Sequence, residues 1–152
     1  MITEPTPAAT GTRSFALPTV KPVAALRWSI AVCYLWFGTL KAVPGLSPAE
    51  DLAGRTVELL TFGLVQGQLA VVVLALFEVM IGIMLLFALR TRFALLLMLG
   101  HMVCTLTPVI LLPDLVFTHV PYGLTIVGQY IVKNLVFMCG AWLVLRSEGT
   151  TA

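Results

Sequence analysis

The sequence has few charged residues for its length. Of its 152 residues, only 11% are Asp, Glu, Lys or Arg, whereas 59% are hydrophobic. Soluble domains average about a quarter charged residues, so these charges are too few to cover a water-facing surface and lipid must cover much of the protein. The net charge of +2 is small and spread along the chain. It excludes a nucleic-acid partner, because such a surface needs clustered Lys and Arg.

Several chemical signatures are also missing. The three cysteines (Cys33, Cys104 and Cys139) are dispersed in apolar segments, and no CxxC motif occurs. An odd, dispersed set predicts neither a disulfide framework nor a thiol metal site, so we interpret the cysteines as apolar packing residues. The sequence lacks G-x-S-x-G, HExxH and phosphate-loop patterns. One histidine and one glutamate within the spans are too few ligands for a metal, and we expect none.

No cleavable targeting signal is visible at the start of the chain. Residues 1–21 are rich in Thr, Pro and Ala, and we expect them to form a disordered tail. The apolar run that follows is too long for the core of a signal peptide, so we expect it to be retained as a membrane span. Residues 22–146 then form the membrane domain, and residues 147–152 form a C-terminal tail.

Four apolar runs are long enough to cross a bilayer, which takes about 20 residues. They cover residues 22–43, 69–89, 93–112 and 124–145. Because only Arg90, Thr91 and Arg92 join the second run to the third, those two helices must be antiparallel neighbours. The sequence therefore predicts an all-α integral membrane protein, an antiparallel bundle of four transmembrane helices whose main partner is the lipid bilayer.

The connection between the first two spans contains a helix signal. Ser47, Pro48 and Glu50 read as an N-cap, a first-turn proline and a capping-box acid. The leucines that follow share one face, namely Leu52, Leu59 and Leu60. This pattern predicts a short amphipathic helix at the membrane surface. An ordinary surface helix with no binding role is the alternative.

Basic residues predict the orientation in the membrane. Arg55 lies on one side, diluted by acidic residues, whereas six basic residues lie on the other side, namely Arg13, Lys21, Arg27, Arg90, Arg92 and Arg146. The positive-inside rule places the richer side in the cytoplasm. We therefore expect both termini to be cytoplasmic, in a bacterial plasma membrane.

Ionisable residues inside the spans are the most informative feature. Glu78, His101 and Lys133 lie near the middle of the second, third and fourth spans. A charge at that depth costs about 2.5–3.5 kcal/mol on insertion scales, so such residues must pair or face a polar cavity. At about 1.5 Å per residue the three lie at the same depth. Lys41, near the outer end of the first span, is expected above them as a lid residue.

Polar neighbours extend this group along each helix. Thr105 lies four residues after His101, and Gln129 lies four residues before Lys133, so each pair shares a helix face. The complete set of candidate ligand-binding or proton-exchanging residues is Glu78, His101, Lys133, Lys41, Gln129, Thr105, Asn134 and Tyr130. The structural alternative is a Glu78–Lys133 ion pair that only fixes helix register.

The motifs around these residues resemble the DoxX-like family of small bacterial membrane proteins. They are Gly38 to Lys41 in the pattern G-x-x-K, Glu78 to Gly82 in the pattern E-x-x-x-G, His101 with Thr105 and Thr107-Pro108, and the run from Gly128 to Asn134. The resemblance covers residues 24–146 and is strongest to the branch similar to the reactive-chlorine-resistance membrane protein. It implies a four-helix bundle and, more loosely, redox work, since relatives include a subunit of thiosulfate:quinone oxidoreductase.

Three functions remain open from the sequence. The first is a redox- or stress-associated membrane protein that binds a quinone or another small polar ligand at the Glu, His and Lys site, as a membrane subunit of an oxidoreductase. The second is a small proton- or solute-conducting transporter, which would need a homodimer because four helices are few. The third is a structural membrane partner of an oxidoreductase.

Overall fold

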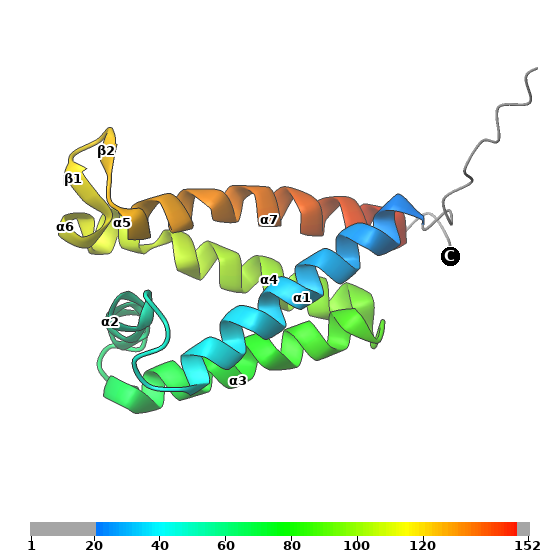
Figure 1. Cartoon of the computed structure of the whole chain (residues 1–152), viewed down its shortest axis with the longest axis horizontal. Helices are drawn as coiled ribbons and strands as arrows, with labels where there is room; N and C mark the ends of the chain where they lie inside the picture. The colour runs from blue at the N-terminus through cyan, green and yellow to red at the C-terminus, as the bar shows by residue number, and fades with distance from the viewer. Residues whose placement is uncertain (1–20, 149–152) are drawn as a thin grey trace, which may run out of the picture.

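The computed structural model describes residues 21–148. Residues 1–20 of the predicted N-terminal tail, including Arg13, and residues 149–152 lie outside the described residues. The four spanning segments are α1 (Pro22–Ala42), α3 (Gly67–Leu86), α4 (Thr91–Leu106) with its continuation α5 (Pro108–Leu111), and α7 (Ile126–Glu148). Each is long and apolar enough to cross a membrane. The protein is therefore an all-α, multi-pass membrane bundle, as predicted (Figure 1).

The helix ends lie close to the predicted ones. α1 begins at Pro22, where the missing N–H of proline removes no helical hydrogen bond. α3 begins two residues earlier than predicted, and it ends at Leu86, because residues 87–90 form a turn with Ala88 and Arg90 in the left-handed region. α7 continues through residues 147–148, which we had expected in the C-terminal tail.

α1 and α3 pack closely because each contributes a glycine to their contact. A Cβ atom on Gly38 would lie 2.9 Å from Val79 Cγ2, and one on Gly82 would lie 2.7 Å from Leu35 Cγ. Small residues allow membrane helices to approach in this way. Arg27 of α1 also donates hydrogen bonds to the carbonyls of Leu85 and Leu86, which ties the start of α1 to the end of α3.

The predicted helix in the first connection exists as α2 (Glu50–Leu60), but its start differs from the prediction. The helix begins at Glu50, and no side chain caps it. Ser47 instead accepts a hydrogen bond from the N–H of Glu50 through its backbone carbonyl. The Glu50 carboxylate reaches back to the N–H of Gly45 at 2.7 Å. This bond closes the loop that follows α1. Glu50 therefore stabilises that loop and does not form the predicted capping box.

The third connection contains elements that the sequence analysis did not predict. A short helix α6 (Pro113–Val116) leads into a two-stranded antiparallel hairpin of β1 (Phe117–His119) and β2 (Gly123–Leu124). Phe117 lies opposite Leu124 in this hairpin. Thr125 then connects the hairpin to α7, since its hydroxyl donates to the Leu115 carbonyl and accepts from the N–H of Gly128.

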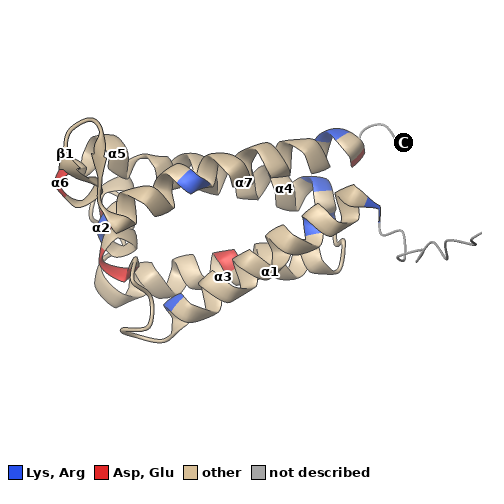
Figure 2. Cartoon of the chain, turned by 45° about the horizontal axis from the view of Figure 1, so that its top comes forward, with Lys and Arg blue, Asp and Glu red and all other residues tan. Residues whose placement is uncertain are grey.

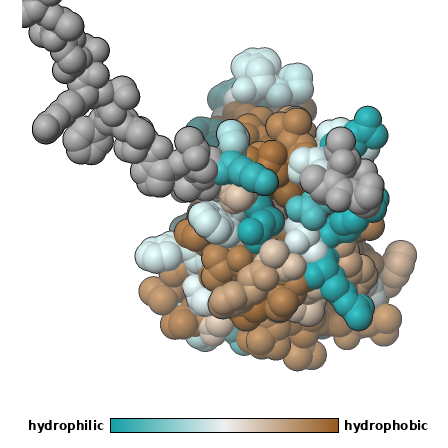
Figure 3. All heavy atoms as spheres, turned by 90° about the vertical axis from the view of Figure 1, so that its right-hand side faces the viewer, coloured by the Kyte–Doolittle hydropathy of each residue, from teal (hydrophilic) through white to brown (hydrophobic). Residues whose placement is uncertain are grey.

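The two ends of the bundle carry different charges. The end where α7 finishes and α3 turns into α4 holds Arg27, Arg90, Arg92 and Arg146, and we name it the basic end. Lys and Arg gather there in Figure 2, and Figure 3 looks onto the hydrophilic side chains of this end. The opposite end carries α2, α6 and the hairpin (Figure 1), and we name it the α2 end.

Candidate functional site

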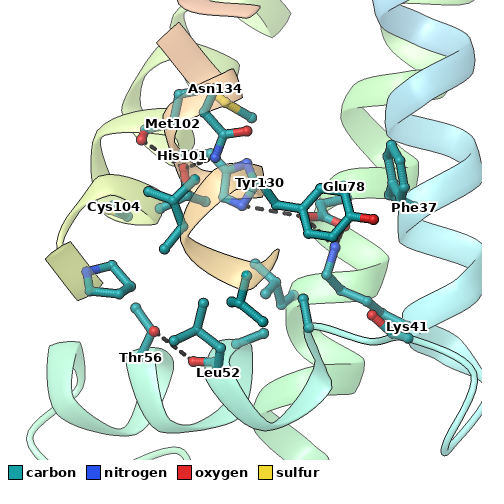
Figure 4. A pocket seen from close by; sticks show the side chains of 18 of the residues that line it. Phe37, Lys41, Leu52, Thr56, Glu78, His101, Met102, Cys104, Tyr130 and Asn134 are labelled. Atoms are coloured by element: carbon teal, nitrogen blue, oxygen red, sulfur yellow. Dashed lines mark hydrogen bonds and ion pairs between the residues drawn. The ribbon is translucent and has the colours of Figure 1, made fainter. Parts of the chain in front are cut away.

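A cavity of about 450 Å³ lies between the spans on the side of the α2 end. Helices α1, α2, α3, α4 and α7 all contribute to its wall, which is mostly apolar. α2 is part of this wall through Leu52, Ala53, Thr56 and Val57. A volume of this size is ordinary for a small-molecule site, where a few polar groups fix the ligand among apolar contacts. Its polar residues include Lys41, Glu78, His101, Thr105, Lys133 and Asn134. Figure 4 shows Lys41, Glu78, His101 and Asn134 among them.

Glu78 is the acidic centre of the cavity wall. Its side chain is only 8% exposed, and the Lys41 ammonium lies 2.7 Å and 3.0 Å from its two carboxylate oxygens. A buried charge of this kind is tolerable only with a hydrogen-bonded partner. The structure therefore supplies the pairing that the sequence analysis required, but it corrects the partner: the ion pair joins Glu78 to Lys41, not to Lys133, and Lys41 is not a separate lid.

The direction of helical side chains explains this correction. Side chains lean toward the N-terminus of their own helix. Lys41 lies near the α2 end of α1, which begins at the basic end, so its side chain leans back toward the level of Glu78. Lys133 belongs to α7, which begins at the α2 end, so its side chain leans toward that end. Equal Cα depth does not bring Lys133 to Glu78.

His101 connects the carboxylate to a buried tyrosine. Its Nδ1 is hydrogen-bonded to the Tyr34 hydroxyl at 3.0 Å, and the ring is enclosed by edge contacts with Tyr34 and Phe77. Its Nε2 lies 3.5 Å from a Glu78 oxygen. Among the described residues this buried nitrogen has no hydrogen-bond partner, since 3.5 Å without suitable alignment is too long for one. When the Tyr34 hydroxyl donates, Nε2 carries the ring proton and presents it to the carboxylate.

Of the other predicted residues, four line the cavity and one does not. The Asn134 amide donates to the Thr105 hydroxyl at 2.9 Å, so α4 and α7 bring these two together in the cavity wall. The Lys133 ammonium lies 4.0 Å from the centroid of the Tyr130 ring. Gln129 is exposed and does not line the cavity, although it lies one turn from Lys133. An i, i+4 spacing places Gln129 and Lys133 on the same side of α7. It does not show whether a residue at the edge of that side points into the cavity or toward lipid.

Toward the basic end the cavity gives way to an apolar core. Ile81, Leu85, Leu95 and Met98 are all completely buried there. Within residues 21–148 no three His, Cys, Asp or Glu side chains gather as metal ligands. Tyr34 is a buried residue of the cavity wall that is not in the predicted set. Its signal was present, since Tyr34 lies seven residues before Lys41 and therefore on the same face of α1.

Comparison with protein families identifies the chain. The DoxX family model matches residues 23–119. The chain belongs to the DoxX family. The match extends from α1 through β1, so it includes Lys41, Glu78 and His101, whereas α7 with Tyr130, Lys133 and Asn134 lies beyond it. Comparison with curated proteins and with solved structures finds no match. The likeness to a particular branch of the DoxX family stays a prediction.

Proposed function

We propose that this DoxX-family protein binds a lipophilic ligand of the quinone class in its cavity and serves a redox- or stress-associated process. The observation that carries the proposal is the Lys41–Glu78–His101 group, a buried polar cluster in the wall of an otherwise mostly apolar cavity. An oxygen atom on a small ring is the acceptor that such a group fits. The apolar walls suit the ring itself.

The remaining polar groups support a ligand with more than one oxygen. The Asn134 amide and the Thr105 hydroxyl bond to each other in the α4–α7 part of the wall, while the Lys41–Glu78 pair lies in the α1–α3 part. These groups would hold oxygens on two sides of a ring. Glu78 and His101 would exchange protons with it, because both side chains lie in the cavity wall. A bound quinone would carry electrons, and an oxidoreductase partner would exchange electrons with it.

Conduction of protons or solutes has less support. A conducting protein needs polar groups that continue through the membrane, but beyond His101 the side chains of Leu85, Leu95 and Met98 are fully buried and apolar. The described polar groups therefore form a site with one apolar end, which suits binding rather than passage.

The proposal is tested by calorimetric titration of purified protein in lipid nanodiscs with a short-chain naphthoquinone, with empty nanodiscs as blank. We expect saturable binding to the wild type and about tenfold weaker binding to His101→Leu, because one hydrogen bond contributes about 1 kcal/mol or slightly more. Val103→Ala is the matched control, since Val103 lies on α4 but is exposed outside the cavity. Non-saturable uptake, or equal binding to all three proteins, would overturn the proposal.

A further inference from the structure

Lys133 is a cation in the cavity wall that the Lys41–Glu78–His101 group does not use. The ion pairs among residues 21–148 all involve other residues, so no carboxylate of that part of the chain lies within 4.0 Å of the Lys133 ammonium. It instead rests on the Tyr130 ring at 4.0 Å. Lys41 and Glu78 neutralise each other, so Lys133 gives the cavity an excess positive charge.

Lys133 also lies where the cavity approaches the lipid. α1 and α7 touch toward the basic end, where a Cβ on Gly140 would lie 3.4 Å from Leu26 and Ile30. From there α1 crosses toward α3 and away from α7 (Figure 1). In the half near the α2 end, side chains of both helices line the cavity and are still exposed, with Phe37 at 50% and Tyr130 at 43%.

This arrangement indicates a lateral opening between α1 and α7. The α2 end of the cavity is covered by α2 itself, and its floor is the apolar core. The remaining side is lined by exposed residues of both helices, with Phe37 on α1 and Tyr130 and Lys133 on α7. Figure 4 shows Phe37 and Tyr130 on their two helices. Lys133 lies seven residues after the start of α7, roughly 10 Å along the helix. A lysine at that depth is costly without an anionic or polar partner.

We propose that the cavity takes its ligand sideways from the bilayer between α1 and α7, and that Lys133 binds an anionic oxygen on the ligand ring. The inference rests on the proposed function and narrows it to acidic ring ligands, such as hydroxyquinones in their ionised form. The low dielectric of the membrane strengthens attraction between Lys133 and such an oxygen. Tyr130 holds the ammonium at the opening by a cation–π contact.

The test compares two probes of nearly equal size: a hydroxynaphthoquinone, whose ring hydroxyl is ionised at neutral pH, and its neutral methyl ether. Wild-type protein in zwitterionic nanodiscs should bind the anion about tenfold more tightly than the ether, one charge-assisted contact. Lys133→Gln should remove this preference while leaving the affinity for the ether within about twofold. Lys133→Arg should retain the preference, since it keeps the charge.

Each of the other outcomes overturns this inference, either alone or together with the proposed function. If neither probe binds the wild type, the proposed function fails and this inference fails with it. If both probes bind the wild type equally, or if Lys133→Gln weakens both to the same extent, the proposed function stands and this inference is overturned. The titration is repeated in nanodiscs with anionic phospholipid. Loss of the preference there would show that Lys133 serves lipid phosphate groups instead, which also overturns it.

Discussion

At the residue scale, the charge of Glu78 depends on a single cation. Lys41 contacts both carboxylate oxygens, while His101 stands 3.5 Å from one of them without a hydrogen bond. Removing one partner of a buried ion pair leaves an uncompensated charge, whereas removing both leaves none. The two lysines of the cavity should therefore differ in their effect on stability.

Lys41→Met should destabilise the protein by about 3 kcal/mol, because it leaves the Glu78 carboxylate buried alone. The double variant with Glu78→Gln should recover most of this loss. Lys133→Met is the matched control and should change stability by less than about 1 kcal/mol, since Lys133 has no carboxylate partner within residues 21–148. Unfolding in detergent measures the wild type, the single variants Lys41→Met, Glu78→Gln and Lys133→Met, and the double variant. Additive losses in the double variant would contradict the pairing.

The sequence predicted the residues of the site better than their contacts. Glu78, His101, Lys133 and Lys41 all line the cavity, because ionisable residues within spanning helices need polar partners or a cavity. The Glu78–Lys133 ion pair, the structural alternative of the sequence analysis, is wrong because Lys41 holds Glu78. Depth counted from Cα positions leaves out the direction of the side chains. A lysine side chain spans more than one helical turn, and its direction depends on which end of the membrane its helix starts from.

At the element scale, contact between α1 and α3 positions the ion pair. Gly38 and Gly82 bring the two backbones together, with hypothetical Cβ contacts of 2.9 Å and 2.7 Å. Gly38 lies one turn before Lys41, and Gly82 lies one turn after Glu78. The spacing of the two helices therefore sets the distance over which Lys41 must reach the carboxylate.

Gly82→Ala should destabilise the protein by about 1–3 kcal/mol, because the added methyl overpacks against Leu35 and the α3 backbone must move away from α1. Gly100→Ala is the control within α4, where a Cβ would meet nothing within 4 Å. It should be neutral or stabilising by up to about 1 kcal/mol, from helix propensity. Thermal unfolding of the two variants in one detergent checks this, and equal losses would refute the close approach of α1 and α3.

The spanning elements were predictable, but the α2 end was not. Long apolar runs dictate helices because lipid offers the backbone no hydrogen-bond partners. The hairpin of β1 and β2 has no such signal: its five strand residues lie among the 14 residues between α5 and α7, which also contain α6. It is held by long-range contacts such as the Thr125 hydroxyl with the Leu115 carbonyl. Local pattern does not reveal contacts of that kind.

At the scale of the whole molecule, the asymmetry of charge predicts the orientation. The basic end carries Arg27, Arg90, Arg92 and Arg146, while Arg55 at the α2 end is paired with Asp51. A green fluorescent protein fused to the C-terminus should fluoresce, and a periplasmic phosphatase fused there should be inactive, because the positive-inside rule places the basic end in the cytoplasm. A dark fluorescent fusion together with an active phosphatase fusion would contradict this orientation. The ligand would then enter from the other leaflet.

The most direct test of the central claim is to determine what occupies the cavity in protein taken from native membranes. An experimental density map of the protein in nanodiscs, combined with mass spectrometry of the extracted small molecules, makes this measurement. We predict density for a ring-shaped ligand in contact with the Lys41–Glu78–His101 group, and a quinone-class compound in the extract. A cavity filled by its own side chains, or occupied only by acyl chains that avoid His101 and Glu78, would contradict the account.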